Sequence, residues 1–313
     1  MQKFIMMCGL PGSGKSTYAK KNFVGENIVY LSSDELREEL LGDENNQEEN
    51  NKVFEEMERR TISALKSGKS VVYDACNTSY KKRMHLLKQI KRYGARKVCV
   101  VVYTDLEDCY KRNAKRKRQV PTWAIDKMLK SFYFPQYFEG WDEIKIVGDI
   151  KTGDPSKMLN GLFFGKNGLV FQDHDNNHHK LSIGYHILLA YTHTLLAGCD
   201  EAVQLAALFH DIGKPFTKGF IDSKGNPCGE AHYYQHHLVS AYFALPILCS
   251  MERVHEDDWN DIFEILALID FHMHPYFWEK ENNEKMKEKY LNLWGEDLLN
   301  KVIALHEADR KAH

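Results

Sequence analysis

The stretch "GLPGSGKST" (residues 9–17) decides the fold of the first half of the chain. It contains the pattern G-x-x-x-x-G-K-[ST], between an apolar run at residues 4–8 and a helical segment. In such a loop, backbone N–H groups face phosphate oxygens, the lysine reaches the β and γ oxygens, and the hydroxyl ligates Mg²⁺. A glycine-rich turn with a chance lysine is the alternative. The pattern predicts a loop that binds ATP and Mg²⁺ through Gly9, Gly12, Ser13, Gly14, Lys15, Ser16 and Thr17, with Ser16 on the metal.

The sequence around this loop alternates between short apolar runs and amphipathic segments. The composition of five runs is typical of buried parallel strands: residues 4–8, 27–31, 70–74, 97–103 and 143–147. Helical spacing occupies residues 47–67 and 79–94 between them. This alternation predicts an α/β P-loop domain with a doubly wound parallel sheet, and a ligand site outside the carboxyl ends of the strands.

The histidines divide the chain into two halves. Of 15 histidines only His85 precedes residue 150, and the others lie between His174 and His313. The turn-rich stretch "VGDIKTGDPSK" supplies a boundary. We therefore predict a first domain at residues 1–150 and a linker at 151–178, with a small hairpin at 161–172 turning at Asn167-Gly168. An all-α domain, with helical spacing in five segments, is predicted for residues 179–313.

The totals favour a soluble protein inside the cell. The net charge of −2 gives no global attraction to nucleic acid, so any basic surface must be local. The seven cysteines lack a C-x-x-C pair, which fits reduced thiols in the cytoplasm better than disulfides or a zinc knuckle. No apolar run approaches the ~18 residues of a membrane-spanning helix, so no membrane partner is expected.

Asp34 and Arg37 follow the second predicted strand, one helical turn apart. An aspartate there can accept a proton from an attacking hydroxyl, and an arginine beside it can bind a phosphate with two hydrogen bonds. The alternative is that Asp34 only caps the N-terminus of a helix at residues 35–41.

The segment "CYKRNAKRKRQVP" (109–121) is the local basic surface, with six positive charges in eight residues. It fits a lid that delivers arginine to a transferring phosphate, a track for a nucleic-acid backbone, or both. The alternative is a solvated helix face.

Residues 1 to about 147 resemble the kinase domain of phage-type polynucleotide 5′-hydroxyl kinases. The resemblance is carried by the loop, by "DELR" (34–37), by "VVYDACNTSYKKR" (71–83) and by "RNAKRKRQVP" (112–121). It implies that Asp34 activates a 5′-hydroxyl and that Arg37 engages the phosphate next to it. It further implies that Lys15 and Ser16 hold ATP and Mg²⁺, and that Asp74 supports Arg37. Arg112 and Arg116 would stabilise the transferring group, with Arg118 as an alternative to Arg116.

In the second half, "ALFHDIGKP" (207–215) places a histidine and an aspartate side by side. Neighbours on a helix differ by ~100°, so His210 and Asp211 can still reach one ion. The carboxylate can also bridge two metals that act on a phosphate ester. Imidazole and carboxylate donors suit Mn²⁺, Fe²⁺, Ni²⁺, Co²⁺ or Zn²⁺ better than Mg²⁺ alone. A structural histidine is the alternative.

The pattern H…HD…D over residues 175–313 resembles the HD superfamily of metal-dependent phosphohydrolases. The matching stretches besides residues 207–215 are "SIGYH", "QHHLVSA", "FHMHP" and "ALHEADR". The resemblance implies a first metal on His186, His210, Asp211 and Asp309, a second on Asp211, His236 and His272, and Lys214 over the substrate phosphate. His193 competes with His186, and ligand, supporting and surface roles stay open for His232, His237 and His274. His174, His178 and His179 are expected in a solvated loop.

Together the two halves predict an enzyme that heals nucleic-acid ends. A broken RNA carries a 5′-hydroxyl and a 3′-phosphate or 2′,3′-cyclic phosphate, and joining needs the opposite chemistry at each end. We expect 5′ phosphorylation with ATP, phosphate removal at the 3′ end, RNA or DNA ends as substrate, and sealing by a separate RNA ligase. The alternatives are a small-molecule nucleoside or nucleotide kinase fused to an HD nucleotidase, and an HD domain that only regulates the kinase.

Overall fold

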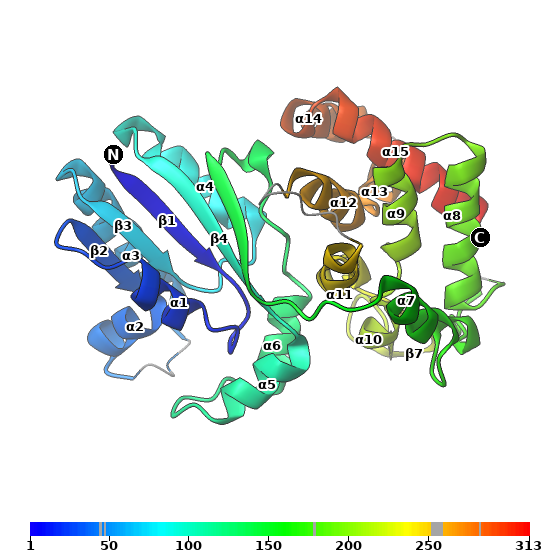
Figure 1. Cartoon of the computed structure of the whole chain (residues 1–313), viewed down its shortest axis with the longest axis horizontal. Coiled ribbons are helices and arrows are strands. Elements are labelled where there is room, and N and C mark those ends of the chain that lie inside the picture. Colours follow the sequence, from blue (N-terminus) through cyan, green and yellow to red (C-terminus); the bar gives the residue numbers. More distant parts are fainter. Residues whose placement is uncertain (44–45, 47, 178–179, 252–258, 282) are drawn as a thin grey trace. The chain divides into compact units, whose positions relative to one another are not determined.

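The computed structural model describes the chain except residues 44–45, 47, 178–179, 252–258 and 282. It divides into two compact units. The first contains Met1–Leu129 and Pro135–Ile150, and the second contains Lys130–Phe134 and Lys151–His313 (Figure 1). No helix in the described ranges is long and apolar enough to cross a membrane.

The first unit is built on a five-stranded parallel sheet in the order β2-β3-β1-β4-β5. Its strands are β1 (Lys3–Cys8), β2 (Ile28–Ser32), β3 (Ser70–Asp74), β4 (Arg96–Thr104) and β5 (Glu143–Asp149). The apolar residues of β1 and β4 are buried, as expected for strands covered on both faces. The predicted doubly wound sheet is confirmed, and the phosphate loop follows β1 at its centre.

The helices of this unit are α1 (Lys15–Asn22), α2 (Ser33–Leu41), α3 (Asn50–Lys66), α4 (Tyr80–Ile90), α5 (Leu106–Ala114) and α6 (Thr122–Leu129). Short 3₁₀ turns lie at η1 (Lys91–Tyr93) and η2 (Tyr137–Glu139). Ser32 caps α2, because its side chain accepts a hydrogen bond from the Glu35 N–H. Asp34 is therefore in the first turn of α2 and is not its N-cap.

The second unit is mainly helical. Its longer helices are α7 (Pro155–Phe164), α8 (Ile183–Leu196), α9 (Glu201–Phe209), α11 (His236–Ser250), α12 (Asn260–Phe271), α14 (Glu284–Trp294) and α15 (Glu296–Lys311). Two shorter helices are α10 (Lys214–Thr217) and α13 (His274–Glu281). A two-stranded antiparallel sheet, β6 (Gly219–Ile221) with β7 (Pro227–His232), interrupts them. Residues 130–134 also belong here, since the Phe134 N–H donates to Asp270 Oδ2 at 3.0 Å.

The hairpin predicted at residues 161–172 is wrong. Those residues contain the end of α7 and the 3₁₀ turn η3 (Leu169–Phe171). Asp154 caps α7 by accepting from the Ser156 and Lys157 N–H groups, and Pro155 occupies its first turn. The helix that begins there runs to Phe164, where the first strand of the hairpin was expected, so part of the expected linker is a helix of the second unit; a turn still follows at residues 166–167. The boundary expected at 178/179 lies outside the described residues.

Candidate active sites

The phosphate loop has the backbone geometry that its glycines permit. The Gly9 N–H donates to the Cys76 carbonyl at 3.1 Å, which fixes the loop beside the end of β3. Gly12 has φ +85°, and a Cβ there would lie 2.3 Å from the Cys109 carbonyl oxygen. Gly14, with φ +93°, immediately precedes α1. The loop therefore opens directly onto the N-terminus of α1, whose first three residues are Lys15, Ser16 and Thr17.

Lys15 keeps its positive charge in a half-buried position. Burial lowers the pKa of its ammonium group, but Cys76, Asp74 and Asp34 raise it above the ordinary value. Asp74 itself accepts a hydrogen bond from the Tyr30 hydroxyl at 2.5 Å. A cation of this kind beside the loop fits a group that neutralises the β and γ phosphates.

Asp34 is surrounded by guanidinium groups. Arg37 Nη1 lies 3.2 Å from Asp34 Oδ1, Arg116 Nη2 lies 3.7 Å from Oδ2, and Arg118 forms a closer ion pair. Burial raises the pKa of Asp34, but Arg118, Lys15 and Arg37 hold it below the usual value. The carboxylate therefore stays ionised, as a general base must be. Arg37 also donates to Asn50 Oδ1 at 2.9 Å.

Arg112 approaches the loop from α5 without reaching Asp34. Its Nη1 donates to Thr104 Oγ1 at 3.2 Å, and Thr104 in turn donates to the Ser13 carbonyl at 3.1 Å. Its Nη2 lies 3.0 Å from Asp149 Oδ2. Of the two arginines left open for the second lid position, Arg118 is the one in close contact with Asp34.

In the second unit, four residues from two helices and the end of a third helix converge. His186 Nε2, on α8, lies 3.2 Å from Asp211 Oδ2 and 3.0 Å from Asp309 Oδ1 on α15. His210, just after α9, places Nε2 3.2 Å from Asp211 and 3.4 Å from Asp309. All four are buried, and one donor atom of each lies within 4.8 Å of the others. This is the first predicted metal set.

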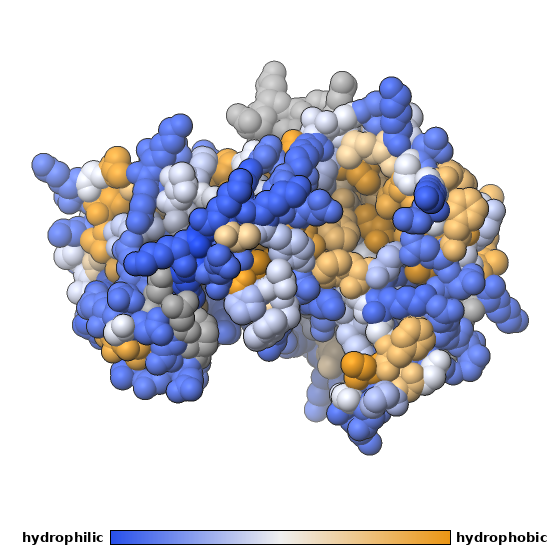
Figure 2. Space-filling view, turned by 90° about the horizontal axis from the view of Figure 1, so that it is seen from below, coloured by the Kyte–Doolittle hydropathy of each residue, from blue (hydrophilic) through white to orange (hydrophobic). Residues whose placement is uncertain are grey.

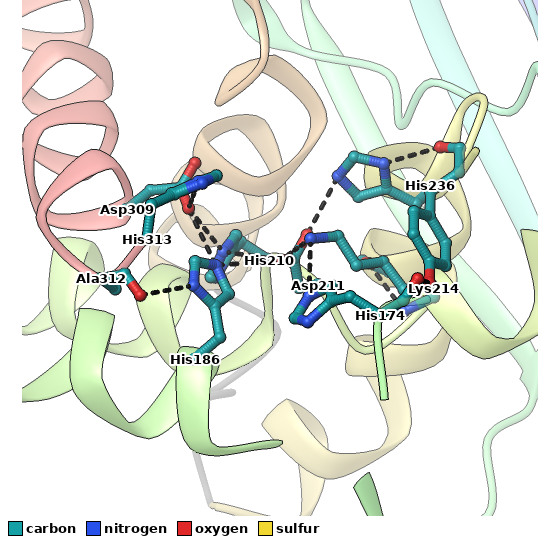
Figure 3. A network of polar contacts seen from close by, with 12 residues as sticks. His174, His186, His210, Asp211, Lys214, His236, Asp309, Ala312 and His313 are labelled. Carbon is teal, nitrogen blue, oxygen red and sulfur yellow. Dashed lines mark hydrogen bonds and ion pairs between the residues drawn. The ribbon is translucent and has the colours of Figure 1, made fainter. Parts of the chain in front are cut away.

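Asp211 faces a second group through its other oxygen. His236 Nε2, at the start of α11, lies 3.0 Å from Asp211 Oδ1, and His272 Nε2, after α12, lies 4.0 Å from it. Figure 3 shows His186, His210 and Asp309 on one side of Asp211 and His236 on the other. The carboxylate is thus placed to bridge two ions.

The histidine tautomers indicate a cation site. In four histidines, Nδ1 faces a backbone carbonyl oxygen, which can only accept a hydrogen bond. Nδ1 must therefore carry the proton, so that Nε2 of the neutral imidazole has a free lone pair. Yet His236 Nε2 and His272 Nε2 lie 3.3 Å apart, which requires a cation or proton between them. The residue set fits metal ions. The Nδ1 contacts are His186–Ala312, His210–Ala207, His236–Tyr233 and His272–Ile269, at 2.7–3.2 Å.

The electrostatics agree with a site that needs positive charge. Burial raises the pKa of Asp211, but His210, Lys214 and His236 hold it well below the usual range. Burial lowers the pKa of His210, but Asp211 and Asp309 raise it to about 10. A proton on His210 can therefore balance these carboxylates, and a metal would displace it.

His174 was missed as a site residue. It was expected in a solvated loop, but it is 2% exposed and its Nε2 lies 3.2 Å from Lys214 Nζ. The same ammonium group lies 2.6 Å from Asp211 Oδ2. Burial and the Lys214 charge lower the pKa of His174 to about 3. No periodic signal marks this residue, because it precedes α8 in an irregular segment. His178 and His179 lie outside the described residues.

The remaining histidines lie either at the metal-donor cluster or against aromatic rings away from it. His186, and not the half-exposed His193, lies in the cluster. His274 packs against the rings of Tyr290 and Trp294, and His232 stacks on Tyr234. His237 is buried beside the cluster, and its ring contacts that of His236. Two supporting residues were missed near Asp309: Tyr276, which donates its hydroxyl to Oδ2 at 3.0 Å, and His313, whose Nε2 lies 3.5 Å from Oδ1.

Comparison with known proteins agrees with the two halves. Residues 4–135 match the AAA domain and residues 183–312 match the HD domain. These matches confirm the predicted pairing of a P-loop domain with a helical HD domain.

Among curated proteins, a chain of Acanthamoeba polyphaga mimivirus designated as a bifunctional polynucleotide phosphatase/kinase is 25% identical over 154 residues. The matched region is 47% of this chain and 33% of that relative, so the chain spans about a third of its length. Two solved chains come from a Pnkp1/Rnl/Hen1 RNA repair complex, at 25% and 26% identity. They cover 42% and 38% of this chain and 43% and 41% of theirs, with TM-scores of 0.38 and 0.34.

Proposed function

We propose that this chain, which joins an AAA domain to an HD domain, is a bifunctional enzyme that heals broken nucleic-acid ends, most of all RNA ends. The observation that carries the proposal is the presence of two phosphate-directed sites with opposite chemistry. One places an ionised Asp34 and its arginines beside an ATP-binding loop, and the other places Asp211 between two groups of metal donors. A kinase and a phosphohydrolase act most usefully together on one broken strand.

In the first site, the loop binds ATP, with Lys15 on the β and γ oxygens and Ser16 on Mg²⁺. Asp34 accepts the proton of a 5′-hydroxyl while that oxygen attacks the γ phosphorus and ADP departs. Arg37 binds the phosphate on the 3′ side of the reacting nucleotide. Arg112, with Arg116 or Arg118, stabilises the charge of the transferring group.

In the second site, Asp211 would contribute one carboxylate oxygen to each of two divalent ions, chosen from Mn²⁺, Fe²⁺, Ni²⁺, Co²⁺ and Zn²⁺. Such ions, when bound, acidify water and neutralise phosphate charge. His186, His210 and Asp309 complete the first metal position, and His236 and His272 complete the second. Lys214 binds the substrate phosphate, held near Asp211 by its contact with His174.

The substrate chemistry follows from the two reactions. A 5′-hydroxyl with a 3′-phosphate or 2′,3′-cyclic phosphate is the pair of ends that both sites together would convert, and the cyclic form arises only from RNA. Healed ends are substrates for a separate RNA ligase, which we expect as a partner. All seven cysteines are free thiols, which fits a cytoplasmic enzyme.

The test uses one short RNA with a 5′-hydroxyl and a 2′,3′-cyclic phosphate, incubated with ATP, Mg²⁺ and Mn²⁺. Mass analysis of both ends should show a new 5′ phosphate and loss of the 3′ phosphate. Asp34→Asn should abolish only the first change, and Asp211→Asn only the second. Matched controls are Glu35→Gln, next to Asp34 but exposed, and His193→Gln, on the helix of His186 but outside the cluster.

Two results would contradict the proposal. Unchanged RNA ends, with phosphorylation and hydrolysis of free nucleosides or nucleotides, would assign the chain to small-molecule metabolism. A kinase that changes when Asp211→Asn is introduced, with no hydrolysis in the wild type, would make the HD domain regulatory.

A further inference from the structure

The basic segment at residues 111–118 contains two kinds of cation, arginines that contact other residues and lysines that are exposed. Its arginines are engaged: Arg112 contacts Thr104 and Asp149, and Arg118, only 11% exposed, contacts Asp34. Lys115 and Lys117 are exposed and form no ion pair with any described residue. The segment therefore supplies positive charge to the kinase site and also holds two lysines available to an external anion.

A large exposed aromatic side chain follows these lysines within a few residues of the sequence. Trp123, in the first turn of α6, is 67% exposed, while the apolar residues Ile125 and Leu129 of the same helix are buried. The other four tryptophans are buried or half-buried. A tryptophan indole left in water gives up a large area of favourable burial, so an exposed one beside cations indicates a surface for a planar, anionic partner.

Hydrogen bonds connect the loop of the two lysines to the segment just before α6, the helix that carries Trp123. The Asn113 side chain donates to the Val120 carbonyl at 2.7 Å and accepts from the Val120 N–H at 3.0 Å, which closes the loop that carries them. Tyr110 of α5 also bonds to Asp126 of α6. Trp123 is three residues beyond Val120, within about 11 Å even for an extended chain. Figure 2 shows hydrophilic side chains gathered over this part of the first unit.

We propose that Lys115, Lys117 and Trp123 form a platform for single-stranded polynucleotide. Backbone phosphates of the strand contact the two lysines, and one base stacks on the indole of Trp123. A nucleic-acid strand is favoured over an acidic protein because it presents phosphates and planar bases together. The inference rests on the proposed kinase function, and it explains how that site would select a strand over a mononucleotide.

The experiment compares two kinase substrates, a 5′-hydroxyl octaribonucleotide and a nucleoside 3′-monophosphate, and measures KM and kcat for each. Trp123→Ala should raise KM for the octamer about 5- to 150-fold, the range of one lost base stack. Trp123→Phe should restore most of the affinity. Neither change should alter KM for the mononucleotide or kcat for either substrate.

The lysines are tested by salt dependence, with octamer binding followed by fluorescence anisotropy. Lys115→Gln with Lys117→Gln should flatten the slope of log K against log salt by about 1.4, at about 0.7 per phosphate contact on a single strand. Lys88→Gln with Lys91→Gln, both exposed in the same unit, is the matched control and should leave the slope unchanged.

Unchanged octamer binding in the Trp123 and lysine variants would overturn the platform and leave the proposed kinase function intact. Equal losses on octamer and mononucleotide would also overturn it, since they would mean that the lid itself was damaged. A wild-type protein that binds the octamer through these residues but phosphorylates neither substrate would support the platform and contradict the proposed kinase.

Discussion

The two candidate sites both hold buried or half-buried carboxylates, but they differ in the source of the positive charge around them. Asp34 is surrounded by arginines of its own chain, so its charge is balanced within the protein. Asp211 and Asp309 are surrounded mainly by imidazoles, and among the described residues Lys214 is the one lysine or arginine in contact with Asp211. The charge of Asp34 is balanced by its arginines, whereas the carboxylates of the second site need protons or metal ions for balance.

The largest effect should follow from Asp211→Asn, which removes the carboxylate shared by both groups of donors. We expect hydrolase activity to fall by more than the roughly 10- to 100-fold that loss of a supporting hydrogen bond costs. Bound transition metal should be lost with it, and kinase activity should persist. Metal content by elemental analysis and the activity of both sites test this. Loss of kinase activity as well would mean that the two sites do not work independently.

A buried ion pair tests whether the first unit also balances a buried carboxylate with its own arginine at a position outside the candidate site. Arg83, 1% exposed, lies 2.6 Å from Glu139 Oε1, and Glu139 also accepts from Trp141 Nε1 at 3.1 Å. Arg83→Met leaves that carboxylate buried without its cation, at a cost of about 3–5 kcal/mol in the free energy of unfolding. Urea unfolding of the first unit measures the loss.

The control variant is Arg59→Met, because the Arg59 side chain is exposed and its partner Glu56 keeps an ion pair with Arg60, so little change is expected. A chelator should leave the unfolding of the first unit unchanged and destabilise the second, because the metal ions proposed for the second unit would balance its buried carboxylates. Equal sensitivity of both units to the chelator would contradict the comparison.

Local patterns predicted the elements that need only nearby residues. The phosphate loop, each parallel strand and the adjacent His210 and Asp211 can each be recognised from a stretch of about ten residues. The partners His186 and Asp309 were found through the family resemblance, which supplied the long-range pairing that spacing alone does not show. The structure places the six metal ligands proposed for the second unit in two neighbouring groups.

What the sequence did not predict depends on tertiary contacts. His174 reaches Lys214 across 40 residues, and Phe134 reaches Asp270 across 136. Neither contact produces a periodicity or a residue spacing in the sequence from which it could be predicted. The hairpin at residues 161–172 failed for a local reason, because the cap at Asp154 and the proline after it favoured a helix.

Tyr276 tests how the second site orients its carboxylates, because its hydroxyl donates to Asp309 Oδ2 while the histidines of the cluster face Oδ1. Tyr276→Phe removes that hydrogen bond and should weaken metal affinity by roughly 10- to 100-fold. Calorimetric titration of the metal-free protein with Mn²⁺ measures the change directly. Tyr185→Phe, exposed on α8, is the matched control. An unchanged affinity would mean that the histidines alone orient Asp309.

The smallest expected effect tests the internal balance at Asp34. Arg118 is the strongest of the charges that keep the pKa of Asp34 below its usual value against the effect of burial. Arg118→Gln should therefore raise that pKa, so that on acidification Asp34 takes up its proton at a higher pH. The acid limb of kcat/KM for a nucleoside 3′-monophosphate, measured from about pH 4 to 7, should move upward. Lys117→Gln, which changes an exposed charge next to Arg118, should leave the limb in place. An acid limb that stays fixed in Arg118→Gln while kcat falls would assign Arg118 to the transferring phosphate, with Arg37 and Lys15 sufficient to keep Asp34 ionised.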